Sequence, residues 1–378
     1  MNIPLFDLNF GSEEVDAVAD TIRSNWISMG EKTSKFETVF SDMLGCKYAI
    51  ALSNCTVALH LALLAVGVGS GDEVIVPSLT FVASVNAIKY CGATPVFCDI
   101  TDYENLNIDP QKVEKRVTEK TKAILVVHFA GFPCAMDELL DIASRFDLAI
   151  VEDACHGPLS EYKEKKLGTI GDVGCFSFYS NKNISTGEGG MLVTNNDHIH
   201  SKVKLIRSHG MTSSSFDRAK GHTTSYDVVD LGYNYRIDDM RSTLGLIQLK
   251  RLNEDLIIRA KKRRLYNELL SRLDNYMYIP FKDNSNFVSN YIMPIVLKNA
   301  NADIRESVRG YLAQNGIQTS VHYPAVHRFQ IYSNHDTSLP ITEYVSDCEM
   351  TLPMYSRLKD EEIEFICIKL SEALSPVP

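Results

Sequence analysis

Short apolar segments alternate with helical patterns from about residue 47 to residue 194. We expect buried strands at 48–53, 72–77, 94–100, 122–129, 147–153, 173–178 and 191–194. Patterns typical of helices separate them, among them 57–66, 80–92 and 136–146. This alternation is typical of a mostly parallel sheet that is covered by helices on both faces, so we predict an α/β fold.

Further elements flank this alternating region. Residues 12–24 and 31–44 carry apolar side chains at helical spacing, and a third helix is expected over 196–208. The stretch 211–227 is rich in Ser, Thr, Asp and Lys, and we interpret it as a mobile loop.

The C-terminal third has a different pattern. A long helix is expected over 239–273, and we interpret its charge run 261–264 as a solvated face. Beyond residue 274 the pattern indicates an α+β arrangement, with a strand over 291–297 and helices at 303–314 and 360–374. We predict two domains: a large α/β domain with an N-terminal helical arm over 1–250, and a smaller α+β domain over 251–378.

Composition narrows the class of protein. The 378 residues carry a net charge of −10, which argues against binding to nucleic acid or to an anionic membrane surface. No apolar run approaches the ~20 residues of a membrane span. The nine cysteines are scattered without a CxxC pair, so we expect reduced thiols in a cytoplasmic protein.

One lysine stands out. Lys182 lies in a polar turn between the strands expected at 173–178 and 191–194, next to the glycine-rich run 187–190. A lysine held on a tight connection between buried strands can serve as a nucleophilic amine. An ordinary surface lysine is the alternative.

Two other positions have candidate chemistry. Residues 53–56 (SNCT) join a strand to a helix, so their N–H groups form an anion site or are simply capped by Ser53 or Asn54. Asp153 ends a strand whose carboxyl end would line a ligand crevice. The side chains of Glu152 and Asp153 must point to opposite faces, so one of them faces the crevice and the other serves structure.

Other patterns do not indicate a site. The glycine clusters 67–71 and 187–190 both precede strands, the reverse of a dinucleotide-binding arrangement. No cluster of ligand residues completes a metal site. In contrast, an amine, a strand-end carboxylate and a helix start match the aldehyde, ring nitrogen and phosphate of pyridoxal 5'-phosphate (PLP).

At these residues the chain resembles the DegT/DnrJ/EryC1/StrS sugar aminotransferases, which are PLP-dependent enzymes of fold type I. The similarity extends from NWISMG (25–30) to TLPMY (351–355). Its most specific motifs are SNCTVALHLAL, GDEVIVPSLTFVAS, TPVFCDI, VEDACHG, GDVGCFSFYSNKN, GEGGMLVT, GYNYRIDD and VHYPAVH. The resemblance implies a mostly parallel seven-stranded sheet in the large domain.

The resemblance also implies roles for individual residues. Lys182 is similar to the lysine that binds the cofactor as a Schiff base, and Asp153 to the partner of its pyridinium nitrogen. The remaining cofactor-binding positions are His156 beside the ring, Phe81 stacked on it, Thr56, Ser177 and the amide of Cys55 or Thr56 at the phosphate, and Asn234 reaching the phosphate of a neighbouring subunit.

The function implied is transfer of an amino group, usually from L-glutamate, to a keto group of a nucleotide-linked sugar. The GEGG run leans toward a 4-keto sugar, and Asn234 implies a homodimer with shared active sites. A PLP-dependent dehydratase, a cyclitol aminotransferase and a regulatory PLP-binding protein without turnover are the alternatives. Relatives that act as dehydratases have histidine in place of the lysine, so Lys182 favours transamination.

Overall fold

The computed structural model describes residues 2–212, 225–333 and 337–374. A central sheet has the order β1-β9-β8-β5-β4-β2-β3, and β9 alone runs antiparallel to its neighbours. Its strands are β1 (Tyr48–Leu52), β2 (Glu73–Pro77), β3 (Thr94–Cys98), β4 (Thr121–Val127), β5 (Ala149–Asp153), β8 (Val173–Ser177) and β9 (Gly190–Thr194). The predicted mostly parallel, seven-stranded α/β sheet is confirmed.

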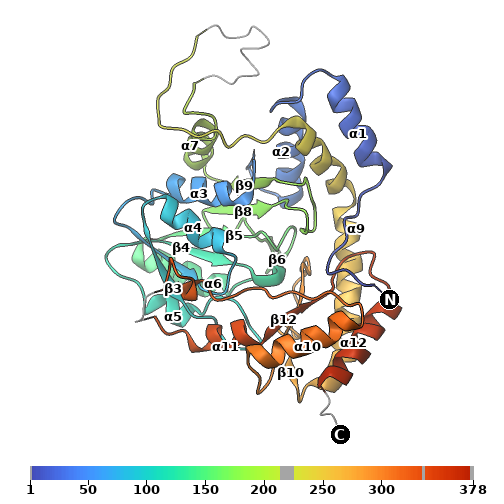
Figure 1. Ribbon diagram of the computed structural model, residues 1–378. Helices are drawn as coiled ribbons and strands as arrows, with labels where there is room; N and C mark the ends of the chain where they lie inside the picture. Colours follow the sequence, from blue (N-terminus) through green and yellow to red (C-terminus); the bar gives the residue numbers. More distant parts are fainter. Residues whose placement is uncertain (1, 213–224, 334–336, 375–378) are drawn as a thin grey trace.

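Helices cover both faces of this sheet (Figure 1). Successive strand residues point to opposite faces, so Leu125 packs in one core and Ile124 in another. One face contacts α3 (Cys55–Ala65), α4 (Val82–Tyr90) and α7 (Asp197–Ile206). The other contacts α2 (Glu31–Leu44), α5 (Pro110–Glu114), α6 (Met136–Phe146) and the first half of α9 (Asp239–Leu270). The strands are therefore buried on both sides, which explains their continuous apolar runs.

A smaller antiparallel sheet forms a second layer of structure around the second half of α9. Its strands are β10 (Met277–Tyr278), β11 (Met293–Leu297) and β12 (Glu349–Leu352), and its helices are α10 (Ala302–Gln314), α11 (Pro340–Cys348) and α12 (Asp360–Leu374). The helix α9 continues through residue 250, at which we placed a domain boundary, and packs against both sheets' cores. The division into two domains stays a prediction.

The remaining elements are short or peripheral. Helix α1 (Ser12–Arg23) packs along α9. The hairpin β6 (Glu161–Tyr162) and β7 (Lys165–Lys166) was not predicted, and neither were α5, α11 and β12. Three single-turn helices complete the described chain: η1 (Phe129–Gly131), η2 (Ser271–Leu273) and η3 (Val326–Arg328).

The charge run 261–264 is only partly exposed, contrary to expectation. Lys261 and Arg264 are exposed, but Lys262 and Arg263 are buried. The Arg263 guanidinium donates a hydrogen bond to the carbonyl of Pro280 and lies 5.4 Å from the centre of the Phe132 ring. The prediction of a wholly solvated face was wrong because α9 is packed from two sides at this point, so that only part of its circumference reaches water.

Two further expectations concern loops and membranes. Most of the polar stretch 211–227 lies outside the described residues, so its interpretation as a loop is not tested. Within the described residues, every helix is too short or too polar to traverse a lipid bilayer.

Candidate functional site

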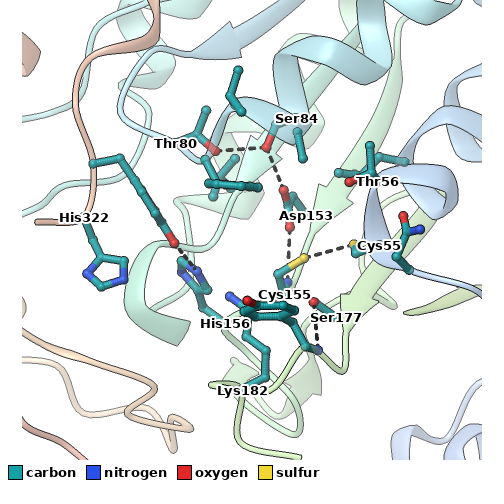
Figure 2. Close-up of a pocket in the computed structure, with 18 of the residues that line it drawn as sticks. Cys55, Thr56, Thr80, Ser84, Asp153, Cys155, His156, Ser177, Lys182 and His322 are labelled. Atoms are coloured by element: carbon teal, nitrogen blue, oxygen red, sulfur yellow. Dashed lines mark hydrogen bonds between the residues drawn. The ribbon is translucent and has the colours of Figure 1, made fainter. Parts of the chain in front are cut away.

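A cavity of about 1030 Å³ lies at the carboxyl ends of β4, β5 and β8. The starts of α3 and α4 form part of its wall, and residues 320–324 close it from the side of the smaller sheet. Figure 2 shows that Lys182, Asp153, His156, Ser177, Cys55 and Thr56 all lie around this one cavity. Parallel strands bring their carboxyl ends to one edge, which is why sequence-distant polar residues meet here.

Lys182 lies on the loop between β8 and β9, as predicted. The Phe178 N–H donates to the carbonyl of Gly189 and closes this loop at its base. The Lys182 ammonium lies 4.1 Å from the centre of the Tyr291 ring, a cation–π contact. A Cβ atom on Gly190 would lie 2.5 Å from the backbone of Asn54, so only glycine lets β9 approach the start of α3 this closely.

The adjacent carboxylates Glu152 and Asp153 point to opposite faces, as expected from strand geometry. Glu152 is fully buried and accepts hydrogen bonds from the N–H groups of Gly168, Ile170 and Gly171. His128 Nε2 lies 2.9 Å from the same carboxylate. Glu152 therefore holds the loop between β7 and β8 against the sheet.

This structural role gives a testable prediction. Glu152→Gln places an amide NH₂ where the carboxylate now accepts hydrogen bonds, so buried donors face a donor. We expect the free energy of unfolding to fall by about 3–5 kcal/mol, the cost of breaking a buried charged interaction on one side. Urea denaturation followed by circular dichroism measures it, and the exposed Glu138→Gln is the control. A loss below about 1 kcal/mol would contradict the role.

Asp153 lies on the cavity side of the sheet. It is buried and accepts hydrogen bonds from Ser84 Oγ (2.8 Å) and the Cys155 N–H (3.2 Å). Because Ser84 donates its only hydroxyl proton to Asp153, Thr80 Oγ1 must donate to Ser84 Oγ across 2.9 Å. Thr80 and Ser84 were not predicted, since they lie at the start of α4, far from Asp153 in sequence.

The first turn of α3 fits both interpretations of SNCT. The Asn54 side chain caps the helix by accepting from the Val57 N–H at 3.1 Å. The Cys55 and Thr56 N–H groups belong to the first turn, where no helix carbonyl can accept from them. Together with the nearby hydroxyls of Thr56 and Ser177, they form a cradle for an anion.

His156 is a neutral imidazole within the cavity wall. The Ala130 N–H donates to Nδ1 at 3.2 Å, so the proton lies on Nε2 and is donated to the Tyr323 hydroxyl at 3.0 Å. Burial lowers the pKa of His156 well below its usual value, and the charge of Lys182 acts in the same direction. The His156 ring stacks on Tyr291 with centroids 4.4 Å apart.

Two thiols lie behind Asp153. Cys155 Sγ is 3.0 Å from Cys55 Sγ, and both are close to the Asp153 carboxylate. Burial raises the pKa of Cys55 to about 11 and that of Cys155 well above its usual value. Protonated thiols are weak metal ligands and weak nucleophiles, so we assign no chemistry to these two thiols in the cavity wall. All nine cysteines are free, as predicted.

The structure places the two remaining candidates differently. Phe81 is 57% exposed, lines the cavity and has its ring 5.9 Å from that of Tyr323. Asn234 is exposed and does not line the cavity of its own chain, although its neighbour Tyr235 does. Sequence reasoning missed His322 and Tyr323 as cavity residues, although both belong to the quoted motif VHYPAVH.

Comparison with known proteins decides the family. The model of the DegT/DnrJ/EryC1/StrS aminotransferase family matches residues 9–371. The chain belongs to this family. GDP-perosamine synthase of Escherichia coli O157:H7 is 36% identical, with 99% of each chain covered.

Solved structures of similar proteins agree with this DegT/DnrJ/EryC1/StrS assignment. Helicobacter pylori PseC, an aminotransferase involved in the biosynthesis of pseudoaminic acid, matches with a TM-score of 0.91 and 27% identity over 99% of both chains. Spr1654 of Streptococcus pneumoniae in its PLP-form matches with a TM-score of 0.91 and 29% identity over 99% of this chain and 100% of that one. The protein is an aminotransferase that uses PLP, which confirms the family, fold type and cofactor expected.

The residues of this DegT/DnrJ/EryC1/StrS aminotransferase fit the cofactor. Among the described residues that line the cavity, Lys182 is the sole lysine or arginine. This agrees with the absence of an arginine directly after the lysine in the sequence. An anion in the cradle must therefore be held by helix N–H groups and hydroxyls on this chain.

Proposed function

We propose that this enzyme transfers an amino group from L-glutamate to the keto group, at C4, of a nucleotide-linked sugar. The observation that carries the proposal is the meeting of Lys182, Asp153 and the start of α3 around one cavity. The name of the E. coli relative, GDP-perosamine synthase, supports a nucleotide-linked sugar as the acceptor. A volume of about 1030 Å³ leaves room for a large substrate beside the cofactor.

Within this proposal each cavity residue has a role. Asp153 holds a proton on the ring nitrogen of PLP, whose ring supplies a sink for carbanion electrons when bound. The Cys55 and Thr56 N–H groups, with the Thr56 and Ser177 hydroxyls, hold the phosphate. His156, a neutral imidazole fixed by Ala130 and Tyr323, would lie beside the ring, and Phe81 would stack on it.

Lys182 moves the proton in this scheme. Its amine takes a proton from the α-carbon of the amino donor in the first half-reaction, and it delivers a proton to the former keto carbon of the sugar in the second. Its contact with the Tyr291 ring keeps the amine above the cavity floor.

An amine-transfer assay tests the function. The enzyme with PLP is incubated with ¹⁵N-glutamate and a panel of acceptors, and mass spectrometry detects labelled amino products. The panel contains GDP-, dTDP- and UDP-linked 4-keto sugars and, separately, a keto cyclitol. Transfer to one or more of these sugars supports the proposal. A dehydrated sugar without nitrogen would favour the dehydratase, a labelled cyclitol the cyclitol aminotransferase, and no product the regulatory protein.

We further propose that two chains share each active site. Asn234 is exposed and does not line the cavity of its own chain, which supports a role at the phosphate site of a partner subunit. We predict that Asn234→Ala weakens cofactor retention by ~1.5–3 kcal/mol, the contribution of a hydrogen bond to a charged group. Dialysis followed by measurement of bound PLP gives this value.

A complementation experiment tests the same arrangement more directly. Lys182→Ala chains and Asn234→Ala chains are mixed under conditions that exchange subunits. A shared site predicts heterodimers with one site carrying both defects and one carrying neither, so activity rises well above that of either variant. Mixing Lys182→Ala with the double variant is the control, because every site then lacks Lys182. Proven exchange without recovery, or an active monomer, would contradict the shared site.

A further inference from the structure

A buried chain of hydrogen bonds leads from the cavity wall to Glu349. His322 lines the cavity, and its Nδ1 lies 2.9 Å from Thr351 Oγ1. Thr351 Oγ1 lies 2.7 Å from one carboxyl oxygen of Glu349. The other carboxyl oxygen accepts from the His322 N–H at 2.7 Å. Glu349 and Thr351 are fully buried and His322 is 6% exposed, so water does not interrupt the chain.

The backbone fixes this geometry. Thr351 and Glu349 belong to β12, and Ser320 pairs with Thr351 as an antiparallel bridge. The side chains of residues 349 and 351 point to the same face of the strand, toward the segment that carries His322. Figure 2 shows the His322 ring at the same cavity as His156 and Lys182.

This chain has two proton arrangements, because a hydroxyl donates only one hydrogen. With Glu349 ionised, Thr351 donates to the carboxylate and accepts from His322 Nδ1–H, which leaves a lone pair on Nε2. With Glu349 protonated, the carboxylic acid donates to Thr351, Thr351 donates to Nδ1, and the proton of His322 lies on Nε2. Each arrangement satisfies every bond in the chain.

We propose that Glu349 acts through Thr351 to set which nitrogen of His322 carries the proton, and thereby whether His322 presents a hydrogen-bond donor or acceptor to the substrate. Glu349 is a positioning residue in this scheme, since it does not line the cavity. When the chain gains its one extra proton, Nε2 takes a proton from the cavity, the Nδ1–H proton passes to Thr351 Oγ1, and the former Thr351 hydroxyl proton passes to Glu349. Ionisation of Glu349 reverses these three transfers. The change in the protonated nitrogen of His322 does not depend on the proposed function, whereas its effect on the substrate rests on it.

Burial and nearby charges together set the pKa of Glu349. Burial raises the pKa of Glu349 to about 8, although the bonds from Thr351 and the His322 N–H, and the charges of Arg305 and Arg309, oppose the increase. Both arginines lie on α10 and pair with Glu306. Glu349 is therefore protonated below about pH 8 and ionised above it.

His322 itself stays neutral over the same range. Burial lowers the pKa of His322 to about 3, and the charge of Lys182 acts in the same direction. The other titratable groups that face it are His156, a neutral imidazole, and two phenols. The Tyr323 ring lies 4.8 Å from that of His322, and the Tyr291 ring lies 6.3 Å from it. Raising the pH therefore exchanges one neutral form of His322 for the other.

We call the hydrogen-bonded chain from His322 through Thr351 to Glu349 the relay. Three variants separate a role of the relay in proton placement from a role in packing alone. Glu349→Gln offers a carbonyl to the His322 N–H and an NH₂ to Thr351, so it mimics the protonated acid at every pH. Thr351→Val keeps the shape but removes the hydroxyl. Thr351→Ser keeps the hydroxyl and is the matched control. His322→Gln identifies the His322 signals in a spectrum.

The deciding measurement is ¹⁵N NMR of the full-length, histidine-labelled enzyme from about pH 6 to pH 9.5. We expect His322 to change from the Nε2–H to the Nδ1–H form in the wild type and in Thr351→Ser. Glu349→Gln should remain Nε2–H throughout, and Thr351→Val should show no change of form. Identical titrations in the wild type and Glu349→Gln, or a change of form in Thr351→Val, would overturn the proposal.

A kinetic measurement then separates this inference from the proposed function. The pH dependence of kcat/KM for the sugar should show an inflection in the wild type and Thr351→Ser that Glu349→Gln lacks. If no sugar accepts the amino group while the NMR change follows Glu349, the proposed function fails and the relay stands. If transfer occurs and all variants share one pH profile, His322 does not act on the substrate and this inference fails.

Discussion

Lys182→Ala is expected to abolish transamination and remove the visible absorbance of the lysine-bound cofactor. In our proposal the Lys182 amine has two tasks: it binds the cofactor aldehyde and it moves the proton. Positioned acid–base catalysis alone contributes about 10²–10⁴-fold to a rate, so loss of both tasks should bring turnover below detection. Absorbance spectra and single-turnover kinetics with glutamate measure the two effects.

The variant should nevertheless fold. Lys182 is partly exposed, and its ammonium contacts the Tyr291 ring. Within the described residues, truncation removes this cation–π contact and takes a partner from no buried carboxylate. An exposed or half-exposed cation–π contact contributes about 0.5–1 kcal/mol, and we expect a loss of stability of that size in urea denaturation.

Lys182→Arg is the matched variant. It keeps a positive charge beside Tyr291 but cannot lose its proton at working pH, so it should be as inactive as alanine. If arginine restored turnover, the charge of residue 182 would matter and its nucleophilic amine would not. Normal transamination by Lys182→Ala would contradict the mechanism as a whole.

Local patterns predicted the large sheet because its strands are buried on both faces. Strands such as β2 and β4 read as continuous apolar runs, and the helices between them have lengths that a parallel crossover requires. The glycines of the run 187–190 could not be assigned from sequence. The structure shows that Gly190 is needed for close approach to α3, and Gly187 for a positive φ of 81°.

The smaller sheet was less predictable. Strand β12 has four residues, includes Glu349 and Thr351, and pairs through Thr351 with Ser320, 31 residues earlier in the chain. A short strand with two polar residues has no distinctive periodicity. The chain of hydrogen bonds from His322 to Glu349 was not predicted either, because its members become neighbours only through the pairing of Ser320 with Thr351.

Candidate residues were predictable from sequence where a reactive side chain lies at or just after the end of a strand. Residues that act by contacting another side chain were not predictable. Lys182 and Asp153 follow strands and carry the functional groups that the cofactor needs. Ser84, which donates to Asp153, and Tyr323, which accepts from His156, lie 69 and 167 residues from their partners. A single sequence contains no signal for such a pairing unless a family motif supplies it.

Asp153→Asn is expected to slow proton abstraction while the cofactor still binds. The variant loses the negative charge that we place beside the ring nitrogen, so the ring is a weaker sink for carbanion electrons. Breaking one side of a buried charge pair costs ~3–5 kcal/mol, which corresponds to about two to more than three orders of magnitude in rate at ~1.4 kcal/mol per tenfold. Single-turnover kinetics with α-deuterated glutamate isolate this step.

The hydrogen-bond network at Asp153 tolerates the change, so the loss can be assigned to charge. The asparagine oxygen can still accept from the Cys155 N–H, and its NH₂ can donate to Ser84 Oγ. The Ser84 hydroxyl then turns to donate to Thr80, because either of these hydroxyls can be the donor. Ser84→Ala is the control: it removes a hydrogen bond but leaves the carboxylate, so its effect on proton abstraction should be smaller than that of Asp153→Asn. A loss below about tenfold in Asp153→Asn would show that a different residue faces the ring nitrogen.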